Sequence, residues 1–151
     1  MHFKLMTLPA HSLLILAASL SAIASVLHIV ILFGGPAWYD RFGAGARIVE
    51  LSKAGHWYPT AITAVIASVL AVWAAYALSA AGVLPRLPLL RTVLCAVTAI
   101  YLLRGLVIVP MLLFARERVN AFLLWSSLVC LFYGAVHGVG LIQVWPMLST
   151  G

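Results

Sequence analysis

The stretch that decides the fold reads RTVLCAVTAIYLLRGLVIVPMLLFAR and runs from Arg91 to Arg116. Its apolar part, from Thr92 to Phe114, contains 23 residues and a single formal charge, that of Arg104 near the middle. A helix needs about 20 apolar residues to cross the hydrocarbon of a bilayer. An arginine at mid-span is costly unless it faces protein, water or an anionic partner. The stretch therefore predicts a transmembrane helix with a polar site at Arg104.

The composition of the whole chain is that of a membrane protein. Its 151 residues are 65% hydrophobic and 8% charged, whereas about 25% of residues are charged in an average soluble domain. A soluble fold of this size could not bury so much apolar surface, so an integral protein of a plasma (bacterial inner-type) membrane is predicted. The net charge of +6 suits anionic lipid headgroups. The cations form no basic stripe with exposed aromatic residues, which argues against nucleic acid as a partner.

Four apolar stretches predict an all-α integral membrane protein. The spans cover about residues 12–34, 60–82, 92–114 and 120–143, and together they make residues 1–151 a single four-helix transmembrane domain. Because the connections are short, an antiparallel bundle is expected. Gly34-Gly35-Pro36 predicts the end of the first span, and Pro146 the end of the fourth, which Asn120 can cap. Pro110 predicts a kink near Leu106, whose carbonyl it leaves without a donor.

The N-terminal region admits a second interpretation. Lys4, the apolar run 13–20 and Ala22-Ile23-Ala24 resemble a signal peptide with its cleavage site, so residues 1–24 are a candidate leader. The apolar stretch continues to Phe33 and reaches the full thickness of a membrane, which favours an uncleaved first span.

The longest loop, Pro36 to Tyr58, predicts a short amphipathic helix at the membrane surface. Residues 46–54 carry Arg47, Glu50 and Lys53 at intervals of three, so Glu50 can pair with either neighbour. A surface cap is favoured over a catalytic role for Glu50.

Three polar residues inside the spans, His28, Arg104 and His137, would be costly to expose to lipid. At 1.5 Å per residue, His28 and Arg104 lie about 9 Å and about 15 Å from the face of the first loop. If the helix faces that carry them meet, they form a polar pocket that opens towards this loop. The charge of Arg104 would then be neutralised by a carbonyl at the kink, by a loop carboxylate or by a bound amphiphile. The candidate ligand-binding residues are Arg104, His28, Tyr101, Ser25, Glu50 and Asp40.

The same depths argue against a cofactor. His137 lies about 26 Å from that face, so His28 and His137 differ by about 17 Å and cannot share a haem. A zinc site needs three or four ligands that converge, whereas the candidate ligands here are scattered along the chain. Cys95 and Cys130 are interpreted as small apolar residues inside the spans. No catalytic residue, metal or cofactor is predicted.

Small residues predict the helix-packing faces. Spacings of four let helix backbones approach closely in lipid. The predicted packing residues are Thr63, Ala67, Ala71, Ala75, Gly134 and Gly138. The partners expected are membrane lipids, together with a second copy of the chain or a larger membrane complex.

Three functions remain open. The first is a non-enzymatic accessory or assembly protein with a polar intramembrane site around Arg104 and His28. The second is a binding or transport protein for an anionic lipid, a quinone-like molecule or a small acid. The third and weakest is an intramembrane enzyme that uses His28 with Glu50 or Asp40, because the chain has only three acidic residues and all lie in loops. The positive-inside rule favours the first and third loops inside the cell by a small margin.

Overall fold

The computed structural model describes residues 10–148, and every regular element in that range is helical. Four helical segments are long and apolar enough to span a membrane, and they confirm the four predicted apolar spans as helices. These segments are His11–Arg41, Trp57–Ala80, Leu90–Phe114 and Ala121–Leu148.

The first helix, α1 (Ala10–Arg41), bends where the sequence predicts a stop. Gly35 leaves helical geometry with φ 66° and ψ −157°. Pro36 then opens a second helical segment, because its ring fixes φ near the helical value and a first turn does not need its N–H. The predicted stop at Gly34-Gly35-Pro36 is confirmed, because the long helix is interrupted at Gly35 and a second, short helical segment follows it to Arg41.

The first loop contains α2 (Ala46–Lys53), which agrees with the helix predicted at residues 46–54. Val49 of α2 is buried against Ile31 and Tyr39 of α1. The next helix, α3 (Trp57–Ala80), begins at the N-cap His56, whose Nδ1 accepts a hydrogen bond from the backbone N–H of Tyr58 at 3.1 Å.

The third span is divided into α4 (Leu90–Leu106) and α5 (Ile108–Phe114), which are separated by Val107. Pro110 has no N–H, so the carbonyl of Leu106 lacks its usual donor four residues later. The predicted kink near Leu106 is therefore confirmed, in the form of an interrupted helix.

A short 3₁₀ turn, η1 (Arg116–Arg118), leads to α6 (Ala121–Leu148). The Oδ1 of Asn120 accepts the Leu123 N–H at 2.7 Å, which confirms the predicted cap. α6 runs through Pro146 rather than ending before it, because a proline in a last turn removes only one intrahelical hydrogen bond.

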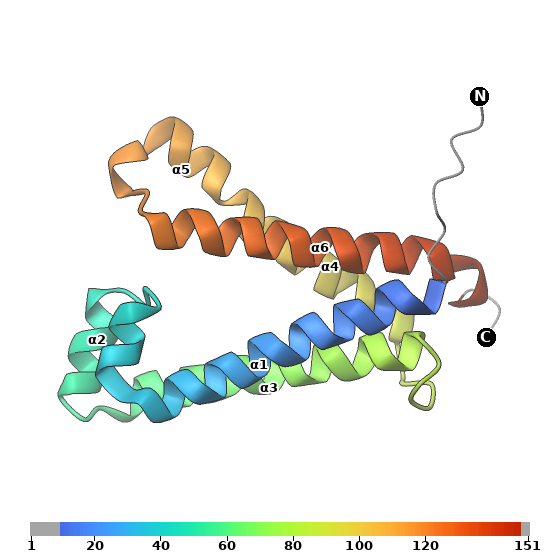
Figure 1. Ribbon diagram of the computed structural model, residues 1–151, viewed down its shortest axis with the longest axis horizontal. Helices are drawn as coiled ribbons and strands as arrows, with labels where there is room; N and C mark the ends of the chain where they lie inside the picture. Colours follow the sequence, from blue (N-terminus) through green and yellow to red (C-terminus); the bar gives the residue numbers. More distant parts are fainter. Residues whose placement is uncertain (1–9, 149–151) are drawn as a thin grey trace.

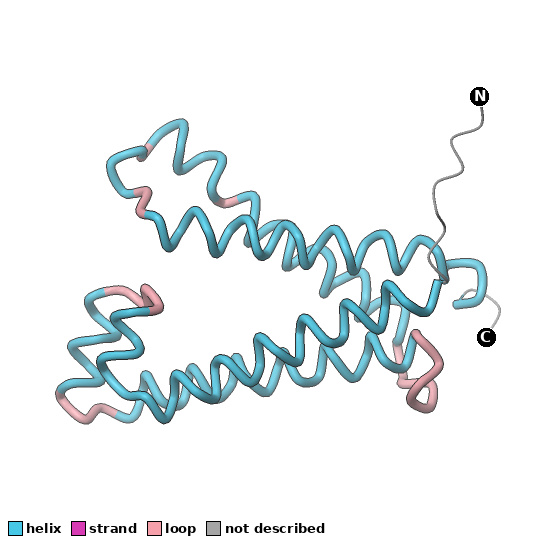
Figure 2. The backbone as a smooth tube through the Cα atoms, viewed as in Figure 1, coloured by secondary structure: helices cyan, strands magenta, loops and turns pink. Residues whose placement is uncertain are grey.

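The long helices pack as two pairs, α1 with α3 and α4 with α6 (Figure 1). The pairs meet at the end where α1 begins and α6 finishes, and they diverge towards α2 and α5 (Figure 2). At the diverging end a Cβ at Gly43 would collide with the ring of Phe122, so the first loop touches the start of α6.

The largest apolar core lies at the end where the pairs meet. Leu14 of α1 and Leu94 of α4 are almost fully buried there together with Val144 of α6. Further along the molecule, Val97 and Tyr101 of α4 pack against Leu70 of α3. These contacts fix α4 and α6 against the other pair and so position the polar side chains described below.

Candidate functional site

Arg104 lies in the last turn of α4, beside the interruption at Val107. Its Nη2 donates to Ser126 Oγ at 3.2 Å and its Nη1 to Ser127 Oγ at 3.4 Å, both on α6. The end of a helix carries partial negative charge from its free carbonyls, which favours a cation at this position. The guanidinium is thus fixed by two neutral hydroxyl groups and a helix end.

No carboxylate neutralises Arg104 within the described residues 10–148. The one ion pair found there joins Arg118 to Glu117 at 3.8 Å on the surface. Asp40 and Glu50, which the sequence suggests as partners, are both exposed and form no ion pair with Arg104. Glu50 does not pair with its neighbours on α2 either.

His28 bonds to its own helix rather than to Arg104. Its Nδ1 lies 2.7 Å from the carbonyl oxygen of Ala24, one turn earlier on α1. Because a carbonyl only accepts, this contact places the proton on Nδ1. Within residues 10–148, no hydrogen bond joins His28 to Arg104, so the structure does not bring this predicted pair into direct contact.

Ser25 and Tyr101, the other two candidates inside the spans, form contacts between helices. Ser25 Oγ donates to the carbonyl of Ala67 at 2.7 Å and joins α1 to α3. Tyr101 Oη lies 3.0 Å from Ser21 Oγ and joins α4 to α1. Both candidates therefore hold helices together in this structure, and neither contacts Arg104 through a hydrogen bond.

The structure reveals a buried polar cluster of Ser21, Tyr101 and His137 that the sequence reasoning did not assemble. His137 is 1% exposed, and its Nδ1 lies 3.0 Å from the carbonyl of Tyr133. This contact makes Nδ1 the protonated nitrogen, so Nε2 faces Ser21 Oγ, at 3.5 Å, as an acceptor. Ser21 is completely buried, like His137, so the two side chains form part of the interior between α1, α4 and α6.

Tyr101 is the centre of this region and contacts all of the other long helices. Its ring packs against Trp73 of α3 at 5.1 Å, and against Tyr133 and His137 of α6 at 5.4 Å and 5.2 Å between ring centres. Its hydroxyl group reaches Ser21 of α1. One side chain thus links the two helix pairs.

The depth arithmetic used for the histidines could have found part of this cluster. Ser21 precedes Gly34 by thirteen residues and Tyr101 precedes Phe114 by the same number, so both lie about 20 Å from the first-loop face. His137, at about 26 Å, is not singled out, because Tyr133 follows Asn120 by thirteen residues and lies at the same depth as Ser21 and Tyr101.

The predicted packing residues differ in how far they are buried in the structure. Thr63 and Ala67 are buried, Ala75 is half-buried and Ala71 is exposed. Residues spaced by four move gradually around a helix of 3.6 residues per turn. Further along α3, the buried positions are therefore Leu70 and then Ala74. On α6, a Cβ at Gly134 would lie 2.7 Å from the side chain of Leu102, and one at Gly138 would lie 3.3 Å from that of Thr98.

The described residues offer no group of three side chains suited to a metal ion. Cys95 is exposed, Cys130 is half-buried, and both are free thiols.

Comparison of the chain with models of protein families, with curated proteins and with solved structures finds no match.

Proposed function

We propose that the protein is a non-enzymatic integral membrane protein that binds an anionic group at Arg104. Its four apolar helices would cross a plasma membrane of the bacterial inner type as an antiparallel bundle. The large apolar side chains on the outside support insertion: Phe33 and Phe114 are 82% and 85% exposed. Such a surface is stable in lipid and unstable in water.

The observation that carries the proposal is the set of partners around Arg104. A charged side chain at the centre of a span costs about 2.5–3.5 kcal/mol on insertion scales. The hydroxyl groups of Ser126 and Ser127 accept two of its N–H groups but supply no negative charge. An arginine carries five N–H donors in a planar fork. The donors that remain free, together with the uncompensated charge, favour a carboxylate or a phosphate.

The exposure of Arg104 favours a ligand that arrives from the lipid. The side chain is exposed on α4, between the apolar residues Leu103 and Val107 on the same surface. An amphiphile would place its acyl chain along these residues and its anionic group on the guanidinium. The proposed ligands are an anionic lipid or another membrane-soluble acid.

We expect Arg104→Gln to lose a copurifying anionic amphiphile without unfolding. Glutamine keeps a polar amide at this position of α4 and removes the charge. Native mass spectrometry of the protein extracted in mild detergent measures the bound amphiphile. Circular dichroism and gel filtration verify the fold.

Arg118→Gln is the matched control for this experiment, because it removes the same charge from an exposed surface position. It should keep the amphiphile. If Arg104→Gln binds as much amphiphile as the unchanged protein, Arg104 is a structural residue and the proposal is wrong.

A second candidate function, that of an accessory subunit, is favoured by an exposed row of small residues on α3. Thr60, Ala64 and Ser68 are all exposed at intervals of four. The Oγ of Ser68 donates to the carbonyl of Ala64 at 2.9 Å, so its hydroxyl is satisfied within the helix. Such a face suits a close contact with another helix in lipid. In that case Ala64→Leu would lower the oligomeric mass measured by light scattering, whereas Arg104→Gln would leave it unchanged.

A further inference from the structure

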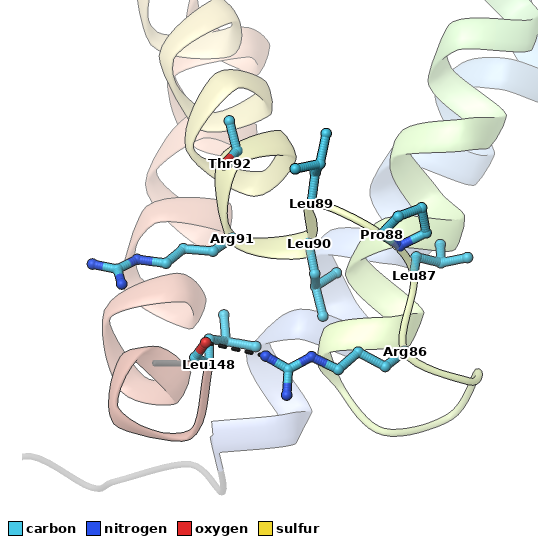
Figure 3. Close-up of a pocket in the computed structure, with 8 residues that line it drawn as sticks. All are labelled: Arg86, Leu87, Pro88, Leu89, Leu90, Arg91, Thr92 and Leu148. Carbon is cyan, nitrogen blue, oxygen red and sulfur yellow. Dashed lines mark hydrogen bonds between the residues drawn. The ribbon is translucent and has the colours of Figure 1, made fainter. Parts of the chain in front are cut away.

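A pocket lies where the loop between α3 and α4 meets the last turn of α6, far along the molecule from Arg104 (Figure 3). Its volume is about 500 Å³, and it is open to the outside. Two arginines line it, Arg86 from the loop and Arg91 from the first turn of α4, together with Thr92 and Leu148. The Arg86 side chain extends to Leu148 at the end of α6, whereas the Arg91 side chain extends away from Arg86 to the Trp145 ring, so the two cations lie at the same end of the molecule on different sides of Leu148 (Figure 3).

Arg86 uses only part of its hydrogen-bonding capacity. Its Nη2 donates to the carbonyl of Leu148 at 3.1 Å, which caps the last turn of α6. The side chain is otherwise exposed, and a guanidinium has four N–H donors besides this one. Arg86 can therefore hold α6 and bind an anion at the same time.

The planar guanidinium of Arg91 packs with its flat face on an aromatic ring, and this contact does not use the N–H groups along its edge. Its guanidinium carbon lies 3.6 Å from the centre of the Trp145 ring, a cation–π contact that leaves the in-plane N–H groups unused. It forms no hydrogen bond or ion pair with any part of the chain that the structure describes. The aromatic ring thus orients the charge without neutralising it.

The backbone of the pocket adds further donors. The first helical bond of α4 runs from the Val93 N–H to the Leu89 carbonyl at 2.9 Å. The N–H groups of Leu90, Arg91 and Thr92 precede it and have no acceptor inside the helix. The N-cap position, Leu89, supplies no side-chain cap. These donors reinforce the preference of the two arginines for an anion.

The charges of the chain leave this end without an acidic side chain. All three carboxylate side chains, those of Asp40, Glu50 and Glu117, belong to the first loop region or to η1. Figure 1 places α2 and the turn after α5 at the opposite end of the molecule. Arg118 has Glu117 as a neighbour there, whereas Arg86 and Arg91 have no acidic partner among residues 10–148.

We propose that this pocket binds the phosphate of an anionic headgroup at the membrane surface. The free N–H groups of Arg86 and the free backbone N–H groups at the start of α4 match the oxygen atoms of a phosphate, and Arg91 adds positive charge at the same end. Trp145 and Tyr76, whose Oη donates to the Pro88 carbonyl at 3.1 Å, are the aromatic types that settle at headgroup level. The site is independent of Arg104, and neither proposal requires the other.

The test compares three probes on the full chain in a neutral detergent. They are a short-chain phosphatidylglycerol, a phosphatidylcholine with the same chains, and inorganic phosphate. A ligand that binds the folded protein raises its unfolding midpoint. We expect phosphatidylglycerol to raise the midpoint and phosphatidylcholine to have little effect. An equal rise with inorganic phosphate, dependent on the same arginines, would support the site and assign it to a free phosphate ester.

The double variant Arg86→Gln/Arg91→Gln should lose at least about tenfold in apparent affinity for phosphatidylglycerol, because it removes two charge-assisted contacts. The control variant Arg116→Gln/Arg118→Gln removes the same charge from the other end and should bind normally. Equal binding by both double variants, or an equal loss in both, would overturn the proposal. If the double variant fails to fold because Arg86 caps α6, Arg91→Gln alone decides: a weaker response supports the site and an unchanged one refutes it.

Discussion

Tyr101 is the residue through which all four long helices meet, and its hydroxyl group is the part that can be tested. We expect Tyr101→Phe to destabilise the protein by about 0.5–1.5 kcal/mol, because it removes the buried hydrogen bond to Ser21 Oγ at 3.0 Å and leaves Ser21 only its contact with His137. Unfolding in detergent, monitored by circular dichroism, measures the change. The aromatic contacts stay in place, so the loss reports on the hydrogen bond.

Tyr133→Phe is the control for Tyr101→Phe. Tyr133 packs against Tyr101 with 5.4 Å between ring centres, but its hydroxyl group forms no hydrogen bond to the described residues. Its substitution should change stability by less than about 0.5 kcal/mol. Equal losses in the two variants would mean that the hydroxyl of Tyr101 is not the tie between the helix pairs.

At the scale of residues, the sequence predicted which polar residues stand out better than it predicted which side chains they contact. Charge and depth singled out Arg104 and His28 without help from the structure. Which side chains they meet depends on how each helix is rotated about its axis. Ser126 and Ser127 reach Arg104 because α6 turns that face towards α4. This rotation is set by packing between helices that are distant in the sequence. The pattern of polar and apolar residues along one sequence does not contain that information.

At the scale of elements, α4 packs closely on α6, and Gly105 is the tightest of the glycine positions between these two helices. A Cβ at Gly105 would lie 2.5 Å from Leu131 Cγ and 2.8 Å from its backbone nitrogen. Backbone cannot move aside as a side chain does, so Gly105→Ala must separate the helices. We expect a loss of about 1–3 kcal/mol in stability, measured by thermal unfolding.

Gly138→Ala on the same interface provides the comparison. Its Cβ would meet only the methyl group of Thr98, at 3.3 Å. We expect it to be tolerated, with a loss of well under about 1 kcal/mol. If it proves as damaging as Gly105→Ala, the two helices are packed more evenly than the structure indicates.

The sequence predicted which segments form helices better than it predicted where those helices end. Length and apolar composition identified the four spans, because about 20 apolar residues in a row have few other uses. Gly34-Gly35-Pro36 and Pro146 were both predicted to end helices. The first helix is interrupted at Gly35 as predicted, whereas α6 continues through Pro146 to Leu148. Proline forbids one hydrogen bond, and neighbouring turns decide whether the helix survives that loss.

At the scale of the whole molecule, the order of the elements predicts which loops share a side of the membrane. The first loop and η1 lie at one end, and the loop between α3 and α4 lies at the other (Figure 1). With Cys95 and Cys130 replaced by alanine, cysteines at Lys53 and Arg118 should react with a membrane-impermeant maleimide from the same side. A cysteine at Val83 should react from the other side. Labelling of all three from one side would contradict four crossings.

The interruption at Val107 would have a consequence if this segment crosses a bilayer. A rigid helix matches one hydrocarbon thickness and must tilt as a whole when the membrane becomes thinner. Here seven residues, Ile108–Phe114, follow the interruption as a separate short helix. In a bilayer, bending between the two helices would shorten the segment and match it to a thinner membrane, while α4 keeps its contacts with α6.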